Sequence, residues 1–241
     1  MNILCIARRD FKAYTHGYAA YVIIASVLFL QGLFFNAWVL RPASARYSHE
    51  VLKEFFHLDG GFAIAAAVLL TMRSLAGERA AGTDVLLSTS TLKPGQIVAG
   101  KWLAAMSMLG LLTLLTGYMP ALIFVNGKVA LAHILVGYLG VLCVGGTCCA
   151  IGIFGSSLFR SQLAAGIFTT VLTVTLVVMW ILSEVLDPPF ADISSYMAIW
   201  NKHFTPFQEG RVLLSGVVYY LSTTGAFLFF SSRVLEGREW E

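Results

Sequence analysis

The sequence predicts an all-α, polytopic membrane protein with six transmembrane helices. Of its 241 residues, 58% are hydrophobic and only 12% are charged, whereas a soluble domain carries roughly 25% charged residues. Charge-free runs recur at about the 20 residues that a helix needs to cross a bilayer. Because backbone groups in lipid must be satisfied within their own segment, these runs are expected to be helices.

The six predicted spans leave no stretch long enough for a separate soluble domain, so residues 1–241 form a single transmembrane domain. The second span is the least regular, because its charge-free part covers only residues 60–72 and the full length includes Asp59. An acid at membrane depth is a functional candidate by default, although Asp59 is expected near the outer boundary. The predicted spans are 17–40, 55–76, 102–125, 131–155, 162–183 and 212–232.

Lys and Arg favour an orientation with both termini in the cytoplasm. With the N-terminus inside, the inner segments hold ten of the 16 basic residues and the outer segments hold six. Ahead of the first span, Ile3, Ile6, Ala7 and Phe11 recur at helical spacing with basic residues on the other side, which predicts an interfacial helix.

The longest inner segment, residues 73–101, leads into GQIVAGKW (95–102), which matches the first seven places of the phosphate-binding pattern G-x-x-x-x-G-K-[ST]. Trp102 replaces the Ser or Thr that would hold magnesium, and no strand precedes the pattern. Lys101 and Trp102 are therefore interpreted as a cationic and an aromatic anchor where the third span enters lipid. The chain is not expected to have an ATP site of its own.

Earlier in this segment, residues 82–89 predict a short helix. Thr83 can cap it, and Asp84 sits in its first turn, where the helix dipole favours an anion. Such a helix either lies on lipid or docks in a groove of a partner protein, and the residues alone leave both open.

Other chemistry finds little support. His49-Glu50 begins a zinc motif, but Lys53 stands where the second histidine is needed. A net charge of +3 without a basic, aromatic-interleaved run gives no indication of nucleic-acid binding. No catalytic, cofactor-binding or metal-ligating residue is therefore expected.

Glycines crowd the fourth span and indicate close helix packing, in a compact bundle or at a dimer face. They are Gly137, Gly140, Gly145, Gly146, Gly152 and Gly155.

Three stretches together resemble the type-2 ABC transporter permeases. TMRSLAGERAAGTDVLLSTSTLKPGQIVAGKWLA (71–104) resembles the loop between spans two and three, and GIFGSSLFRSQLAAG (152–166) the segment joining spans four and five. HFTPFQEGRVLLSGVVYYLS (203–222) and the closing VLEGREW are similar to the gliding-motility branch of that family. The narrower motif consists of His203, Phe204, Phe207 and Gly210.

The resemblance implies a permease subunit in the bacterial inner membrane that pairs with a second copy or close relative. Two separate ATP-binding subunits would hold the ATP and Mg²⁺, and an auxiliary periplasmic subunit is possible. The short helix would be the coupling helix seated in an ATPase groove, which favours docking on a partner over lying on lipid. Its interface would comprise Glu78, Arg79, Gly82, Thr83, Asp84, Val85, Leu86 and Leu87.

The sequence departs from the gliding-motility branch at three places. Leu213 and Gly216 stand where acids are expected, and Glu209 stands where a basic residue is expected. The same cargo is therefore not implied, and a nitrous-oxide-maturation branch of similar architecture remains an alternative. A non-transporting membrane scaffold of a motility or envelope machine is the alternative from a different class.

Overall fold

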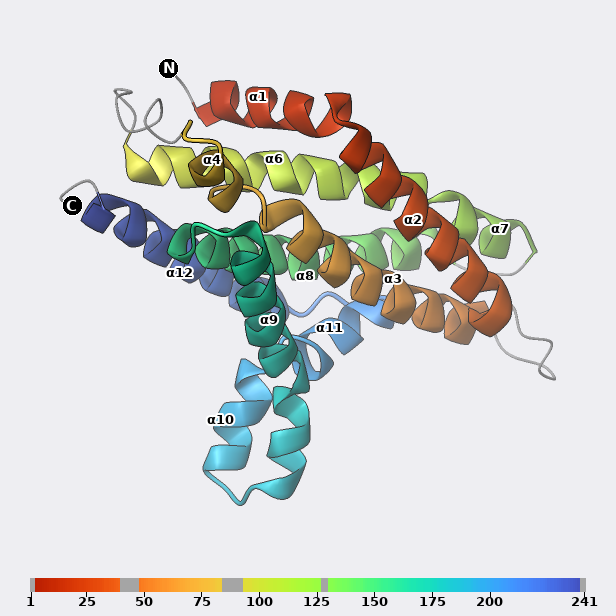
Figure 1. The fold of residues 1–241 in the computed structure, drawn as a ribbon. Coiled ribbons are helices and arrows are strands. Elements are labelled where there is room, and N and C mark those ends of the chain that lie inside the picture. The colour runs from red at the N-terminus through yellow and green to blue at the C-terminus, as the bar shows by residue number, and fades with distance from the viewer. Residues whose placement is uncertain (1–2, 40–47, 84–92, 127–129, 239–241) are drawn as a thin grey trace.

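A computed structural model describes residues 3–39, 48–83, 93–126 and 130–238 of the chain. Within these ranges the regular structure is entirely helical (Figure 1). The elements are α1 (Ile3–His16), α2 (Tyr18–Phe34), the π-helix η1 (Phe35–Val39), α3 (Ser48–Thr71), α4 (Ala76–Ala80), α6 (Pro94–Leu115), α7 (Tyr118–Asn126), α8 (Leu131–Leu158), α9 (Gln162–Val185), α10 (Phe190–Met197), α11 (Asn201–Gln208) and α12 (Leu214–Arg238).

Five helices in the described ranges are long and apolar enough to cross a membrane, and they coincide with the second to sixth predicted spans. They are Ser48–Ala80, Pro94–Val125, Leu131–Leu158, Gln162–Val185 and Leu214–Gly237. The first predicted span corresponds to α2 and η1, where the apolar helix Ile24–Ala37 is shorter. A helical membrane protein is thus supported. A sixth crossing, which the first predicted span would provide, stays a prediction.

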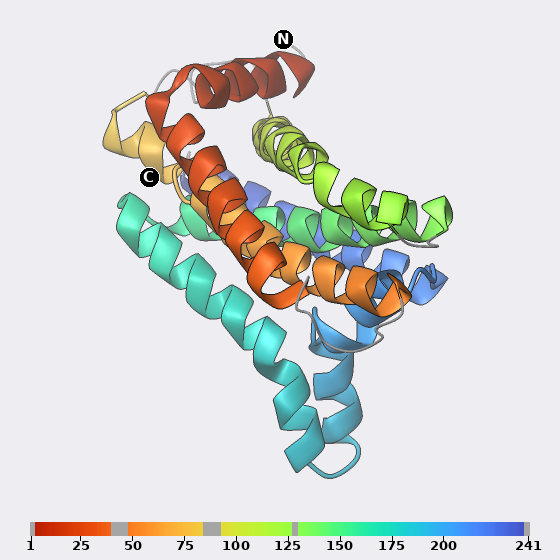
Figure 2. The ribbon, with the colours of Figure 1, turned by 90° about the vertical axis from the view of Figure 1, so that its right-hand side faces the viewer.

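Helix α8 is the centre of the bundle, with α3, α6, α9, α11 and α12 packed around it (Figures 1 and 2). Its glycines make this possible, because a Cβ at Gly137 would overlap the Phe56 ring and one at Gly140 would overlap Phe207 Cβ. Farther along α8, the Leu109 side chain packs in the same way against Gly145, and the Thr71 side chain packs against Gly152. The glycine face of α8 is therefore filled by the chain's own side chains, which assigns it to the bundle and not to a dimer face.

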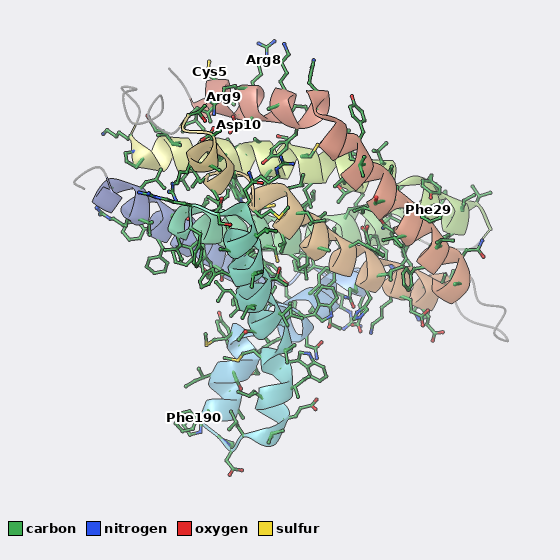
Figure 3. The ribbon with its side chains drawn as sticks, viewed as in Figure 1. Cys5, Arg8, Arg9, Asp10, Phe29 and Phe190 are labelled. Atoms are coloured by element: carbon green, nitrogen blue, oxygen red, sulfur yellow. The ribbon has the colours of Figure 1, made fainter. Side chains whose placement is uncertain are left out.

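Helices α9 and α10 form a hairpin that leans away from the bundle (Figures 1 and 2). Phe190 lies near its far end, as the side-chain view shows (Figure 3). Along α9, Leu163, Ile167 and Val171 are exposed, as expected for a helix with a face turned to lipid.

The predicted N-terminal helix is confirmed as α1, and its apolar face packs against α6. Ile6 and Ala7 are buried, and a Cβ at Gly100 would lie 2.8 Å from Ile6 Cβ and 3.1 Å from Ile3 O. The glycine of the phosphate-loop look-alike is thus the point at which α1 crosses α6.

The glycine face gives a direct test of the packing. Gly140→Ala should destabilise the protein by about 1–3 kcal/mol, because the new methyl group cannot fit without moving α11. Gly61→Ala on α3 is the matched control, since nothing lies within 4 Å of its Cβ position and alanine favours a helix over glycine by up to about 1 kcal/mol. Thermal unfolding in detergent distinguishes them, and equal melting temperatures would contradict the packing.

Candidate functional site

The turn between α3 and α4 is fastened to the end of α8 by one buried hydroxyl. Ser156 Oγ accepts hydrogen bonds from the backbone N–H groups of Leu75 and Ala76, each at 2.9 Å, and donates to Met72 O at 3.3 Å. The first N–H groups of a helix have no partner within it. Ser156 therefore supplies from α8 the cap that α4 lacks from its own sequence.

Arg79 completes this attachment from the other direction. Its Nη1 donates to Ser157 O at 2.7 Å and to Phe159 O at 3.1 Å. The last carbonyls of a helix lack partners and carry the negative end of its dipole, so a guanidinium is well placed there. Nη1 of Arg79 thus lies on the end of α8, and the predicted place of Arg79 at an interface with a partner stays a prediction.

Four charged side chains, Arg9, Asp10, Glu78 and Lys101, form what we call the charge cluster. Lys101 Nζ lies 2.9 Å from Glu78 Oε2 and 3.1 Å from Asp10 Oδ2, and it donates to Ser74 O at 2.9 Å. Arg9 closes the cluster with Nη2 at 2.8 Å from Glu78 Oε1 and Nε at 2.8 Å from Asp10 Oδ1. The cluster joins α1, α4 and α6, and its two cations balance its two anions.

Lys101 is only 2% exposed, so its interpretation as a lipid-surface anchor was wrong. A buried ammonium needs partners that replace its hydration, and the two carboxylates and a carbonyl provide them. Trp102 is also not a free interfacial anchor, because its Nε1 donates to Gly146 O on α8 at 2.9 Å. In Figure 3, Arg8 points away from the bundle, whereas Arg9 and Asp10 lie on the side of α1 that faces α4.

The described residues that follow Glu78, up to Thr83, close the end of α4. Gly82 has a φ of +68°, Thr83 N donates to Glu78 O at 2.9 Å, and Gly82 N donates to Arg79 O at 3.1 Å. These bonds are the Schellman motif that closes a helix. The Thr83 hydroxyl donates back to Glu78 O at 3.2 Å. That Thr83 caps a following helix stays a prediction, because that helix would lie outside the described residues. The remaining predicted residues, Asp84, Val85, Leu86 and Leu87, lie outside the described residues.

The segment GQIVAGKW is helical throughout, because α6 begins at Pro94. A phosphate-binding loop needs its glycines in a loop ahead of a helix. Gly100 lies at the crossing with α1 and Lys101 belongs to the charge cluster. Two of the three residues that match the pattern therefore have a structural explanation, and the third, Gly95, has no neighbour within 4 Å of its Cβ position.

The motif of His203, Phe204, Phe207 and Gly210 folds as α11 and its end, and it packs inward. Phe204 and Phe207 are fully buried against the positions of Gly60 and Gly140. The His203 ring stacks on Tyr219 with centroids 3.8 Å apart, and its Nε2 lies 3.0 Å from Tyr196 O. Burial lowers the pKa of His203. A structural role explains all four residues, since Gly210 takes a φ of +76° beneath His133.

Glu209, which departs from the resembled pattern, pairs with Lys53 of α3 at 2.6 Å. The hydrogen bond from Lys53 lowers the pKa of Glu209. The pair therefore contributes above the carboxyl's ordinary titration range and is lost as the pH falls through the lowered pKa. Its exposure to solvent makes that contribution small.

Asp59 is buried between α2, α3 and α6, and its expected place near the outer boundary stays a prediction. Gln31 Nε2 of α2 donates to its Oδ1 at 2.5 Å. The other oxygen, Oδ2, has no hydrogen-bond partner among the described residues. Sequence reasoning found the acid but missed Gln31, because nothing in an apolar run singles out one neutral amide.

Sequence reasoning also missed Asp10 and Ser156. Asp10 is the one acid in the basic N-terminal helix, and that exception was a usable signal. Ser156 stands beside Ser157 among small residues and carries no such signal, because only the fold brings α4 to it.

Comparisons with known proteins add no assignment. No protein-family model matches the chain, and a search of curated proteins found no significant match.

The charge cluster predicts a large difference between two charge reversals. Glu78→Lys should destabilise the protein by about 3–5 kcal/mol, because it leaves buried Lys101 beside a second cation. Glu236→Lys on α12 should change stability by less than about 1 kcal/mol, because its pair with Arg233 is exposed. Denaturation in the same detergent compares them, and similar losses would contradict a buried cluster.

Adjacent serines test the attachment of α4. Ser156→Ala should cost about 1–3 kcal/mol, because it leaves two buried N–H groups without an acceptor. Ser157→Ala should cost less, since its hydroxyl bonds to Phe154 O of its own helix. The free energies of unfolding of the two variants test this difference. A larger loss for Ser157→Ala than for Ser156→Ala would contradict the proposed cap.

Proposed function

We propose that the chain is the permease subunit of an ATP-driven ABC transporter of the bacterial inner membrane. The observation that supports this best is the charge cluster. It fastens the connection between α3 and α6 to α1, at the end of the bundle where both termini lie (Figure 1). A permease that is driven by ATP-binding subunits on its cytoplasmic side needs such a rigid connection between its docking segment and its spans.

In this proposal, force enters through the segment that contains Asp84 to Leu87. Thr83, directly before it, is hydrogen-bonded to the backbone of Glu78. From Glu78 the force reaches α1 and α6 through Arg9 and Lys101. From the same turn it reaches α8 through Ser156 and Arg79. A displacement of this one short segment would thus move α4, α1, α6 and α8 together.

The nucleotide and its Mg²⁺ would be held by two separate ATP-binding subunits, and this chain would contribute no catalytic residue. The helical state of residues 95–102 favours that division. A second permease copy or close relative would complete the membrane part, with an auxiliary periplasmic subunit possible. The cargo would be amphipathic or polymeric and would be moved outward, or the motion itself would be transmitted across the membrane.

Affinity purification in mild detergent tests the proposal. The wild-type chain should recover a stoichiometric soluble protein that carries a complete G-x-x-x-x-G-K-[ST]. Asp84→Lys should lower that recovery at least tenfold with an unchanged melting temperature, because it reverses the charge of the docking segment. Glu236→Lys, which reverses an exposed acid near the end of α12, should recover the partner normally.

Two outcomes would contradict the proposal. Recovery of the chain alone, or only with other membrane proteins, would favour a scaffold of a motility or envelope machine. Equal recovery with Asp84→Lys would separate any ATPase from this segment. If an ATPase is recovered, the cargo that the assembled transporter moves then distinguishes the gliding-motility branch from the nitrous-oxide-maturation branch.

A further inference from the structure

Within the described membrane part of the protein, one buried acid has an oxygen with nothing to bind. Asp59 is 3% exposed and Gln31 is 1% exposed. The amide nitrogen of Gln31 donates to Oδ1, which leaves Oδ2 as a buried polar atom without a partner in the described residues. A buried polar atom without a partner is strongly unfavourable, and a bare buried charge even more so.

A small void adjoins this acid. It measures about 10 Å³ and is lined by Gln31, Asp59, Thr113 and Thr116 together with apolar side chains of α2, α3 and α6. A water molecule needs at least roughly 10–15 Å³ on this measure, and it needs polar partners. Thr113 and Thr116 donate their hydroxyl hydrogens to Gly110 O and Thr113 O, each at 2.9 Å, so their oxygens remain able to accept. The void is therefore at the lower limit of size for one water, and it has the polar lining that a water needs.

No basic group in the described ranges neutralises Asp59 as a carboxylate. Residues 17–40 and 102–126, which supply α2, η1, most of α6 and α7, contain no charged residue. Lys101, at the start of α6, belongs to the charge cluster, and His133 of α8 bonds to Gln208 O at 2.8 Å. On α3 itself, His57 packs on Trp200 and contacts Gln208. The titratable group from α8 on this side is Tyr138, whose hydroxyl lies 3.4 Å from Thr116 Oγ1.

We propose that Asp59 is a proton-binding site within the membrane part of the protein, which holds its proton on Oδ2 together with one water in the adjoining void. Gln31 fixes which oxygen carries the proton, because the oxygen that accepts from an amide is the carbonyl oxygen. The water accepts a hydrogen bond from the protonated Oδ2 and donates one to the hydroxyl oxygen of Thr113 or Thr116. Every polar atom of the site then has a partner.

A sodium ion fits this site less well than a proton. Gln31 turns its NH₂ group, and not its oxygen, toward the carboxyl, and an amide donor opposes a cation. A neutral carboxyl also removes the charge from the apolar contact between α2 and α3. The site is independent of any ATPase, so it stands or fails separately from the proposed function.

Infrared spectroscopy of the purified protein at pH 7 tests the proposal. Wild type should show the carbonyl stretch of a protonated carboxyl, shifted in deuterium oxide, and Asp59→Asn should lack it. Exposed acids do not contribute, because they are ionised at this pH. The amide of this variant has nearly the shape of the neutral acid, so the melting temperature should stay within about 3 °C, a shift that corresponds to less than about 1 kcal/mol for a chain of this size.

A second variant keeps the test decisive if Asp59→Asn does not fold. Gln31→Leu removes the donor to Oδ1, so the same band should move to higher frequency while its intensity remains. Absence of a protonated-carboxyl band in wild type at pH 7 would overturn the proposal. Loss of the band on adding sodium chloride at constant pH, with potassium chloride as control, would replace the proton with a sodium ion.

Discussion

The burial of the Lys101 ammonium is the constraint on which one end of the molecule depends. A cation that is 2% exposed must have its hydration replaced, and its partners come from three separate places in the chain. Asp10 belongs to α1, Glu78 to α4 and the carbonyl of Ser74 to the turn after α3. Because one nitrogen requires all three, the N-terminal helix, the short helix and α6 are fixed relative to one another.

The same end is also attached to the central helix. Ser156 caps α4, and Arg79 binds the last carbonyls of α8. Helix α8 can receive these neighbours because its glycine face admits side chains from α3, α6 and α11. The polar contacts at the bundle end and the close packing in its interior thus form one continuous structure. Such a structure could transmit a displacement from the connection between α3 and α6 to the spans.

The extent of the spans followed from the sequence because a membrane crossing needs a long apolar run, which local composition reveals. The predicted spans 131–155 and 162–183 agree with α8 and α9 to within three residues at each end. The agreement is poorer elsewhere, because α3 and α6 begin earlier than the spans predicted for them and α12 ends later. The first span remains a prediction, because the apolar helix in the described part of α2 and η1 is shorter than the others.

The roles of individual charges could not be predicted in the same way. A lysine followed by tryptophan before an apolar run is typical of an interfacial anchor. Only the fold shows that Asp10, 91 residues away, reaches Lys101, and that α1 covers Gly100. Asp59 was found because an acid in an apolar span is locally conspicuous. Its isolation from any cation depends on α2 and α6, which sequence spacing does not place.

The most direct measurement of the account is hydrogen–deuterium exchange of the wild-type protein and Lys101→Met in the same detergent. If Lys101 holds three segments together, the variant should show faster exchange in α1 and α4 together. Helix α12, which has no residue in the charge cluster, should exchange as in wild type. Faster exchange confined to the first turns of α6, with α1 and α4 unchanged, would show that the buried ion pairs do not join these helices.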